Sequence, residues 1–280
     1  MRASLLKRYF EKIKEDKIAL LSLIIILILI TSSILIQFYP KDPNQINITN
    51  DLIKPSKGNL FGTDDLGRDY FTRVLYGGRA SLAVGILSMT ISTSIGTIIG
   101  VISGFYGGVV DNIIMRVIDI LMSIPSFFLI LILNAYLKPG IKNIIIIIGL
   151  FGWMGIARFV RAETLSVKER EYVSYAKMIG IKDSTIMLRH IIKNIFGTIV
   201  VTSTINIANA ILTESSLSFL GLGVQQPNSS WGSMLKDAQK YLGDAPYLAL
   251  FPGLLILITV LCFNVLGDSL RYTVEIKSEK

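Results

Sequence analysis

Residues 157–194 read ARFVRAETLSVKEREYVSYAKMIGIKDSTIMLRHIIKN, a charged segment with long apolar runs on both sides. Crossing a bilayer takes about 20 apolar residues in a helix, and both flanking runs approach or exceed that length. Two membrane helices need only a few residues to connect them. A polar segment of this size therefore has more than a connecting role, and we interpret residues 158–193 as a docking surface for a soluble partner.

The composition indicates an integral membrane protein. Hydrophobic residues make up 51% of the 280-residue chain, which is high for a soluble domain. We predict an all-α, polytopic fold in which the first crossing is a permanent anchor, because its apolar run is too long for a cleaved signal. The six predicted membrane helices lie at about residues 18–38, 81–104, 113–136, 141–157, 195–220 and 246–267.

The distribution of positive charge predicts the orientation. With the N-terminus inside, 18 of the 28 Lys and Arg residues fall on the inner side of the membrane. Because inner loops carry the excess of positive charge, both termini and residues 158–193 are expected in the cytoplasm, with a basic lead at residues 1–17 on the inner surface. This bias also accounts for the net charge of +8 without a nucleic-acid partner.

An exposed outer loop follows the first crossing, and the chain then reads GTDDLGRDYFTRVLYGG up to residue 78. We predict a short interfacial helix here, with Thr63 or Asp64 as its cap. Asp69 and Arg73 are expected to pair at the i,i+4 spacing. The two glycines at 77–78 are expected to end this helix before the second crossing begins.

The second crossing carries small residues at every fourth position, namely Ser88, Ser92, Gly96, Gly100 and Gly104. This spacing places them on one helix face, where a neighbouring backbone can come close. We interpret the row as a helix-packing surface, with a substrate-lining role as the alternative.

Two further features are predicted for the third crossing. Arg116 and Asp119 are spaced i,i+3 and are expected to pair near the inner surface. Pro125 is expected to kink the helix, because proline removes a backbone hydrogen bond.

The sequence EYVSYAKMIG at 171–180 indicates a short helix within the charged segment. Tyr172, Ala176 and Gly180 are four residues apart and form one row, with Val173 and Lys177 beside it. A narrow ridge with a small residue in its middle is suited to enter a groove on another protein. Gly180 is expected to end the helix.

The next helix is expected to begin directly after this segment, with Asp183 or Ser184 as its cap.

Polar residues inside the apolar runs are candidates for function, since they are costly there. Asn206 and Asn209 on the fifth crossing suit helix–helix hydrogen bonds or the lining of a translocation path equally well. Glu214 falls near the outer end of the same crossing. We expect a structural role for Glu214, capping or pairing at the helix end, with substrate contact as the alternative.

Other chemistry is excluded by the sequence. Cys262 is the single cysteine and His190 the single histidine, so we expect neither a disulfide within the chain nor a metal site. No G-x-x-x-x-G-K-[ST] phosphate loop is present, so the chain is not expected to bind ATP, to be an enzyme or to hold a cofactor.

The charged segment resembles the cytoplasmic coupling loop of importer-type ATP-binding-cassette (ABC) permeases, whose pattern is E-A-A, three residues, G, nine residues and I-x-L-P. Ala176 and Gly180 agree with that pattern. Ser174 and Tyr175 depart from it, and Lys193 replaces the usual proline. The carboxylate of the pattern is lost, and Glu171, one turn earlier, is the residue that could replace it.

Four longer blocks resemble the peptide/nickel branch of these permeases, in particular its second permease subunit, the type with an extra N-terminal helix. The likeness covers nearly the whole chain. It implies a type I ABC importer permease (MetI-like) fold, with an N-terminal region at 1–78 and a permease domain of five core helices at 79–275. The four blocks are GTDDLGRDYFTRVLYGGRASL (62–82), FYGGVVDNIIMRVIDILMSIPSF (105–127), ARFVRAETLSVKEREYV (157–173) and ESSLSFLGLGVQQPNSSWGSML (214–235).

The resemblance implies a permease subunit in the inner or plasma membrane of a prokaryote, importing di- or oligopeptides. The implied partners are a sister permease, two cytoplasmic ABC ATPases and an extracytoplasmic binding protein. Nickel is the alternative cargo, and a secondary transporter or a non-transporting scaffold is the alternative class. The residues implied to couple to the ATPase are Glu171, Tyr172, Val173, Ser174, Tyr175, Ala176, Lys177 and Gly180.

Overall fold

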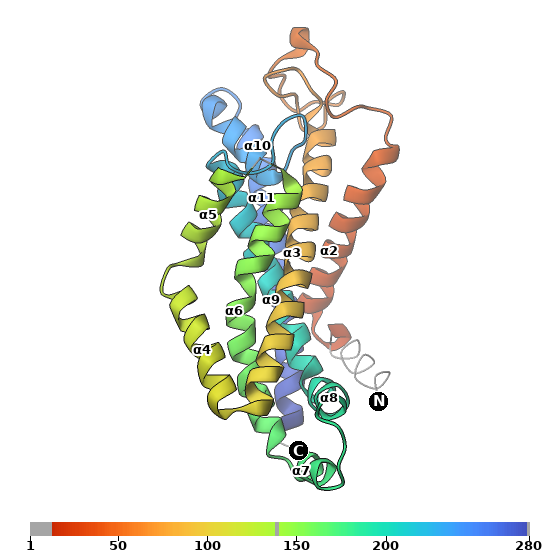
Figure 1. Cartoon of the computed structure of the whole chain (residues 1–280). Helices are drawn as coiled ribbons and strands as arrows, with labels where there is room; N and C mark the ends of the chain where they lie inside the picture. The colour runs from red at the N-terminus through yellow and green to blue at the C-terminus, as the bar shows by residue number, and fades with distance from the viewer. Residues whose placement is uncertain (1–12, 138–139, 279–280) are drawn as a thin grey trace.

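The computed structural model of the chain describes residues 13–137 and 140–278, with side chains described as far as residue 271. Figure 1 shows a bundle of long helices, with loops and the short helix α10 at one end and the short helix α7 at the other. Within the described residues the only β pairing is an isolated bridge between Thr63 and Asp69. The all-α fold predicted from the sequence is confirmed. Most of the predicted basic lead lies outside the described residues.

The helices follow one another along the chain with short connections. Four elements are single short turns, η1 (Ile36–Phe38), η2 (Ile48–Asn50), η3 (Ile186–Ile191, a π-helix) and η4 (Gln239–Tyr241). The α-helices are α2 (Lys17–Leu35), α3 (Tyr70–Tyr106), α4 (Gly108–Met122), α5 (Ser126–Tyr136), α6 (Ile141–Lys168), α7 (Glu171–Met178), α8 (Asp183–Thr185), α9 (Ile192–Phe219), α10 (Trp231–Ala238) and α11 (Tyr247–Ser278).

Five stretches of the described chain are helical, apolar and long enough to cross a membrane as single spans. They contain α2, α3, α6, α9 and α11. α4 and α5 are together long and apolar enough for a sixth span if the pair is counted as one, and they are bent by 72° at their junction. Pro125 lies at this junction, so the kink predicted there is confirmed.

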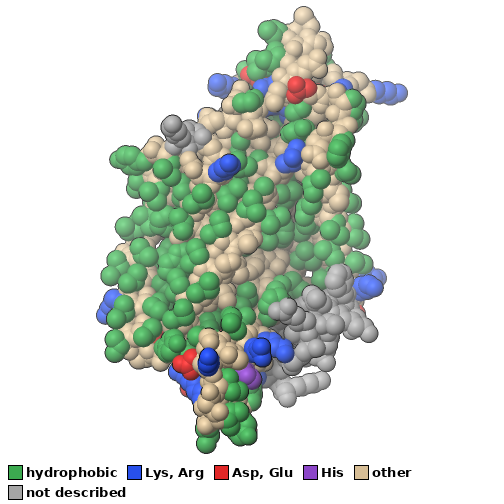
Figure 2. Space-filling model, turned by 45° about the vertical axis from the view of Figure 1, so that its right-hand side comes forward, with side chains coloured by type: hydrophobic (Ala, Val, Ile, Leu, Met, Phe, Trp, Pro, Cys, Tyr) green, Lys and Arg blue, Asp and Glu red, His purple; other side chains and the backbone are tan. Residues whose placement is uncertain are grey.

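The two ends of the bundle differ in construction. We call residues 39–69 and 220–246 the loop cap, and residues 169–191 the tip. The loop cap is mostly irregular chain around α10, whereas the tip is the hairpin of α7, α8 and η3 that joins α6 to α9. In Figure 2 the middle of the visible face is largely hydrophobic, and most charged side chains lie toward the two ends.

The predicted interfacial helix before the second crossing is wrong as a separate element. α3 is one helix of 37 residues that begins at Tyr70, and Asp69 caps it by accepting a hydrogen bond from the Thr72 amide at 3.1 Å. The two glycines at 77–78 lie inside the helix, at positions where other parts of the chain approach too closely for a larger residue. A Cβ added at Gly78 would lie 3.0 Å from the indole ring of Trp231.

The expected pairing of Asp69 with Arg73 is also wrong. The Arg73 Nε lies 3.3 Å from Asp64, and the Asp69 carboxylate is 2.9 Å from the Lys41 amine. The Asp64 carboxylate binds Arg68 as well, with Nε at 2.6 Å. Because a buried arginine requires a counter-ion, this arrangement ties the first turns of α3 to the loop cap.

At the opposite end, Asp119 pairs with Arg158 on α6 and not with Arg116. Asp111, at the start of α4, accepts two hydrogen bonds from Arg161, each 2.5 Å long. These ion pairs join α4 to α6. The spacing of residues along one helix predicts pairs only within that helix, so it could not identify them.

Candidate functional site

α7 forms the far end of the tip and turns one face inward. Val173 is fully buried and Ala176 is 3% exposed, and both belong to a cluster with Phe105 of α3 and Ile186 and Ile191 of η3. The amine of Lys177 lies 4.4 Å from the centre of the Phe105 ring. The inward face of α7 is therefore part of one apolar cluster with α3, α6 and η3.

A left-handed residue ends α7. Gly180 has φ of +77°, a conformation that residues with a Cβ rarely adopt. Its amide donates to the Lys177 carbonyl at 3.0 Å, and the Ile181 amide donates to the Ala176 carbonyl at 3.1 Å. These two bonds form a Schellman motif. The predicted end of the helix at Gly180 is confirmed, whereas the predicted cap of the next helix is wrong, because Asp183 already lies inside α8 and Lys182 precedes it.

The predicted ridge of Tyr172, Ala176 and Gly180 is not the exposed face of α7. Ala176 points into the bundle. The apolar surface that faces outward includes its neighbour Tyr175 instead. The outermost side chains there are Tyr175, Met178 and Ile179, exposed by 64%, 85% and 57%. Residue spacing alone does not predict which side of a short helix is buried, because the burial depends on packing against α3 and η3.

We call Tyr172, Tyr175, Met178 and Ile179 the tip patch. These side chains lie together on a turn that belongs to none of the membrane spans. Partial burial raises the pKa of the Tyr172 phenol, against the opposing charge of Arg170. A neutral apolar surface outside the bilayer is typical of a protein–protein contact. The other predicted coupling residues, Glu171, Ser174, Lys177 and Gly180, are exposed around it.

The row of small residues on α3 faces α6. Ser92 donates to the Gly149 carbonyl at 2.9 Å. A Cβ added at Gly96, Gly100 or Gly104 would lie 2.6–2.8 Å from a backbone carbonyl of α6. The two backbones are in such close contact that there is no room for a larger side chain.

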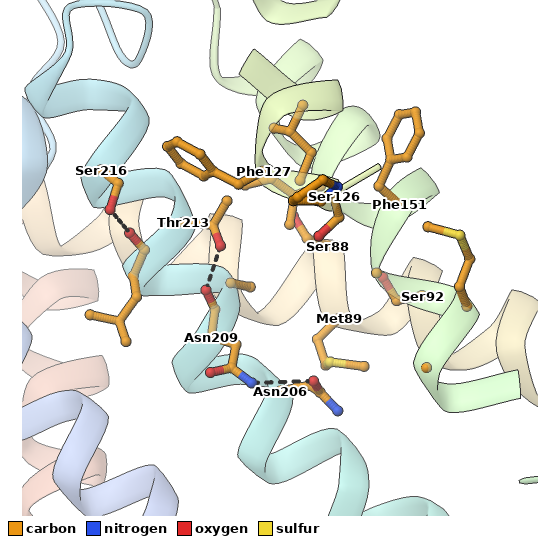
Figure 3. A pocket seen from close by; sticks show the side chains of 18 of the residues that line it. Ser88, Met89, Ser92, Ser126, Phe127, Phe151, Asn206, Asn209, Thr213 and Ser216 are labelled. Atoms are coloured by element: carbon orange, nitrogen blue, oxygen red, sulfur yellow. Dashed lines mark hydrogen bonds between the residues drawn. The ribbon is translucent and has the colours of Figure 1, made fainter. Parts of the chain in front are cut away.

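A cavity of about 670 Å³ lies between α3, α6, α9 and the bend of α4 and α5. Figure 3 shows Asn206, Asn209 and Thr213 on the α9 side of this cavity. All the residues that line it are uncharged. The Ser88 hydroxyl is buried and has no partner among the described residues, and it also lines the cavity.

Polar side chains of α9 form hydrogen bonds within the helix itself. The Asn206 amide nitrogen donates to the Thr202 carbonyl at 2.8 Å, and the Thr213 hydroxyl donates to the Asn209 carbonyl at 2.8 Å. The Asn206 Oδ1 accepts from the Asn209 Nδ2 at 3.4 Å, and each of the two amide nitrogens keeps a second N–H. The cavity therefore offers a few dispersed amide donors and acceptors together with apolar surface, which suits a neutral or variable solute held weakly.

Glu214 does not line this cavity. It is fully buried, and its carboxylate accepts hydrogen bonds from Ser81 of α3 at 3.1 Å and Ser218 of α9 at 2.6 Å. Ser230 and the Trp231 amide extend the network to α10, with bonds of 3.2 Å to Ser218 and to Ser81. The carboxylate thus bonds α3 to α9, and the two serines extend this network to α10 of the loop cap.

Replacing Glu214 with alanine is expected to lower the free energy of unfolding by about 2–4 kcal/mol, because it leaves a cavity and two unsatisfied hydroxyls. Glu214→Gln keeps the shape of the side chain and one acceptor oxygen, so we expect it to lower the free energy of unfolding by less. Thermal unfolding in detergent measures both. Equal midpoints for Glu214→Ala and the wild type would contradict this structural role.

Sequence reasoning missed Trp231 and Ser230, which anchor α10. The Trp231 indole donates to the Val74 carbonyl at 2.9 Å, and Ser230 and Ser233 form a reciprocal capping box. The S-x-x-S spacing before a short helix is a signal that could have found this cap. Among the described residues, no group of three His, Cys, Asp or Glu side chains is placed to hold a metal ion.

Comparison with known proteins gives a consistent result over the whole length. Residues 96–277 match the family described as "Binding-protein-dependent transport system inner membrane component". Residues 4–55 match a second family, "N-terminal TM domain of oligopeptide transport permease C".

Several curated proteins are similar to this chain from end to end. The oligopeptide transport system permease protein OppC of Bacillus subtilis is 40% identical over 278 residues, covering 99% of this chain and 91% of the relative. The dipeptide transport system permease protein DppC of Alkalihalophilus pseudofirmus is 39% identical, with coverages of 96% and 88%. The glutathione transport system permease protein GsiD of Shigella flexneri is 41% identical, with coverages of 96% and 89%.

Proposed function

The chain belongs to the family of binding-protein-dependent transport system inner membrane components, and we propose that it forms half of the membrane path of an ATP-driven peptide importer. It is a multi-pass permease component. ATP hydrolysis takes place on separate ABC ATPase subunits, and a sister permease forms the other half of the path. An extracytoplasmic binding protein delivers the cargo. Peptide is the favoured cargo because the relatives are named for oligopeptide, dipeptide and glutathione transport.

The tip patch is the proposed contact with an ATPase subunit. Its side chains are apolar, largely exposed and outside the membrane spans. The surrounding segment carries eight Lys and Arg residues between 158 and 193, which supports a cytoplasmic location for the tip and for both termini. The remaining predicted coupling residues, Glu171, Ser174, Lys177 and Gly180, are proposed as the polar rim of this contact.

The proposal rests mainly on one observation: α7 has an exposed apolar face on one side and packs against the bundle on the other. Outward it presents the tip patch, and inward Val173 and Ala176 pack against residues of α3, α6 and η3. α3, α6 and α9, which continues from η3, also line the 670 Å³ cavity. A displacement of α7 by the ATPase therefore moves the walls of the cavity, which is the coupling that alternating access requires.

The proposed path runs through this cavity, with Asn206, Asn209 and Ser88 as lining residues. Glu214 is proposed as a structural residue, and Ser92, Gly96, Gly100 and Gly104 as the packing surface between α3 and α6. We also propose that residues 1–78 are an addition to a core permease domain at 79–275, although α3 continues without a break across that boundary.

ATP-dependent uptake tests the proposed function. The chain, its sister permease, the ATPases and the binding protein are reconstituted in vesicles, and entry of radiolabelled trialanine and of ⁶³Ni²⁺ is compared. We expect trialanine uptake that requires ATP and the binding protein. Nickel uptake alone would reassign the cargo, uptake without ATP would indicate a secondary transporter, and no uptake of either would favour a scaffold.

Replacing Asn209 with leucine is expected to lower trialanine uptake about tenfold, because it removes an acceptor from the path and narrows it. ATPase activity of the assembled complex is expected to change less than twofold. The matched control is Leu212→Asn, also on the cavity wall, which is expected to retain uptake. Unchanged transport by Asn209→Leu would remove this residue from the path.

A further inference from the structure

A second cavity, of about 600 Å³, lies beside the loop cap and shares no lining residue with the first. Its volume is in the range of small-molecule sites, about 300–1,000 Å³. Its walls are the first turns of α3, the start of α6, two residues of the loop at 43–44 and the segment 224–229. Unlike the first cavity, it contains a charged side chain, that of Arg79.

Arg79 has no counter-ion among the described residues. Arg68 and Arg73, its neighbours along the chain, are buried and both bind Asp64. The Arg79 side chain is exposed, and its guanidinium lies 5.3 Å from the centre of the Tyr76 ring. Stacking on a ring leaves the N–H groups at the edge of the guanidinium free for an anion.

The neighbouring amide groups add donors of the same kind. Arg73 donates a hydrogen bond to Asn44 Oδ1 at 3.1 Å. Because this contact occupies the amide oxygen, the NH₂ group of Asn44 stays available as a donor. Asn228 makes no hydrogen bond with any other described residue. Together with Arg79, these two amides give a group of uncommitted donors on one cavity.

The two glutamines of the cavity present acceptors instead. Gln225 Nε2 donates to the carbonyls of Gly221 and Gly223 at 3.0 and 3.3 Å. Gln226 Nε2 donates to Asp237 at 3.5 Å. Since carbonyls and carboxylates only accept, these contacts fix both amide groups and leave their Oε1 atoms available for N–H donors.

We propose that this cavity is a subsite for the carboxylate end of the cargo, with Arg79, Asn44 and Asn228 on the carboxylate. The glutamine oxygens then accept the adjacent peptide N–H groups. Hydrogen bonds from Trp231 to Val74 and Ser81 fix the register of α3 on both sides of Tyr76 and Arg79. This inference rests on the proposed function, since it assumes a peptide cargo.

Protection of a reporter cysteine tests the subsite directly. Cys262 is replaced by alanine, Ala83 on the cavity wall by cysteine, and the assembled transporter is labelled with a membrane-impermeant maleimide. Trialanine is expected to slow labelling, whereas trialanine amide, which lacks the carboxylate, is not. Arg79→Gln is expected to raise the trialanine concentration for half-protection at least about tenfold, and Arg79→Lys by less.

Arg116→Gln is the matched control, because Arg116 is an exposed arginine on α4 that lines neither cavity. Equal protection by trialanine and its amide, or protection that survives Arg79→Gln, would overturn the subsite. Labelling that depends on Arg79 and on phosphatidylglycerol, but not on peptide, would also overturn it in favour of a lipid headgroup. Absent trialanine uptake by the wild type refutes peptide import, whereas uptake without protection refutes only the subsite.

Discussion

Replacing Met178 with aspartate is expected to abolish ATP-driven uptake while leaving a folded chain in the membrane. Met178 is 85% exposed in the isolated chain, so the substitution costs at most about 0.5 kcal/mol of stability. In the proposed complex the same carboxylate would be buried against the ATPase without a partner. That penalty is several kcal/mol, which weakens association at least about a hundredfold.

Ile48→Asp is the matched control for this prediction. Ile48 is 74% exposed and lies in the loop cap, at the opposite end of the molecule from the tip. The measurement is the amount of ATPase that copurifies with the permease, together with uptake. If Met178→Asp retained its ATPase and transported normally, the tip patch would not be the docking surface.

Gly100→Leu is expected to give the largest loss of folded protein. A Cβ at Gly100 lies only 2.6 Å from the Ala157 carbonyl and 2.8 Å from the Val160 Cβ. Neither contact can be relieved by turning a flexible side chain, so α3 and α6 must separate. We expect a destabilisation of at least about 3 kcal/mol, the upper end of the range for overpacked cores.

Two separate glycine-to-alanine substitutions, one at a close contact and one in open space, provide the control for close packing. Gly100→Ala is expected to destabilise the protein, whereas Gly155→Ala has open space around the added Cβ and gains helix propensity of up to about 1 kcal/mol. Thermal unfolding in detergent compares the two. Equal midpoints would show that the close contact between α3 and α6 does not stabilise the fold.

The sequence predicted features that depend on local composition. The apolar runs located the membrane spans, Pro125 located the bend between α4 and α5, and Gly180 located the end of α7. In each case the cause is within the residue or its own helix. Apolar length, a missing amide hydrogen and a tolerated positive φ need no knowledge of distant partners.

The errors involve partners that are distant in sequence. Gly78 was expected to end a helix, but it lies inside α3, where its small size makes room for Trp231, far along the chain. Ala176 was expected at the partner surface, but it is buried under α3 and η3. The spacing on α7 defined a face correctly, and only tertiary packing determined which face remained exposed.

The central claim is that the tip lies in the cytoplasm, where an ATPase can reach it, and cysteine accessibility tests this most directly. Lys182→Cys on the tip and Asp42→Cys in the loop cap are each made in a Cys262→Ala chain and treated with a membrane-impermeant maleimide on intact cells. We predict labelling of Asp42→Cys in intact cells and of Lys182→Cys only after permeabilisation. Labelling of Lys182→Cys in intact cells would place the tip outside and contradict the account.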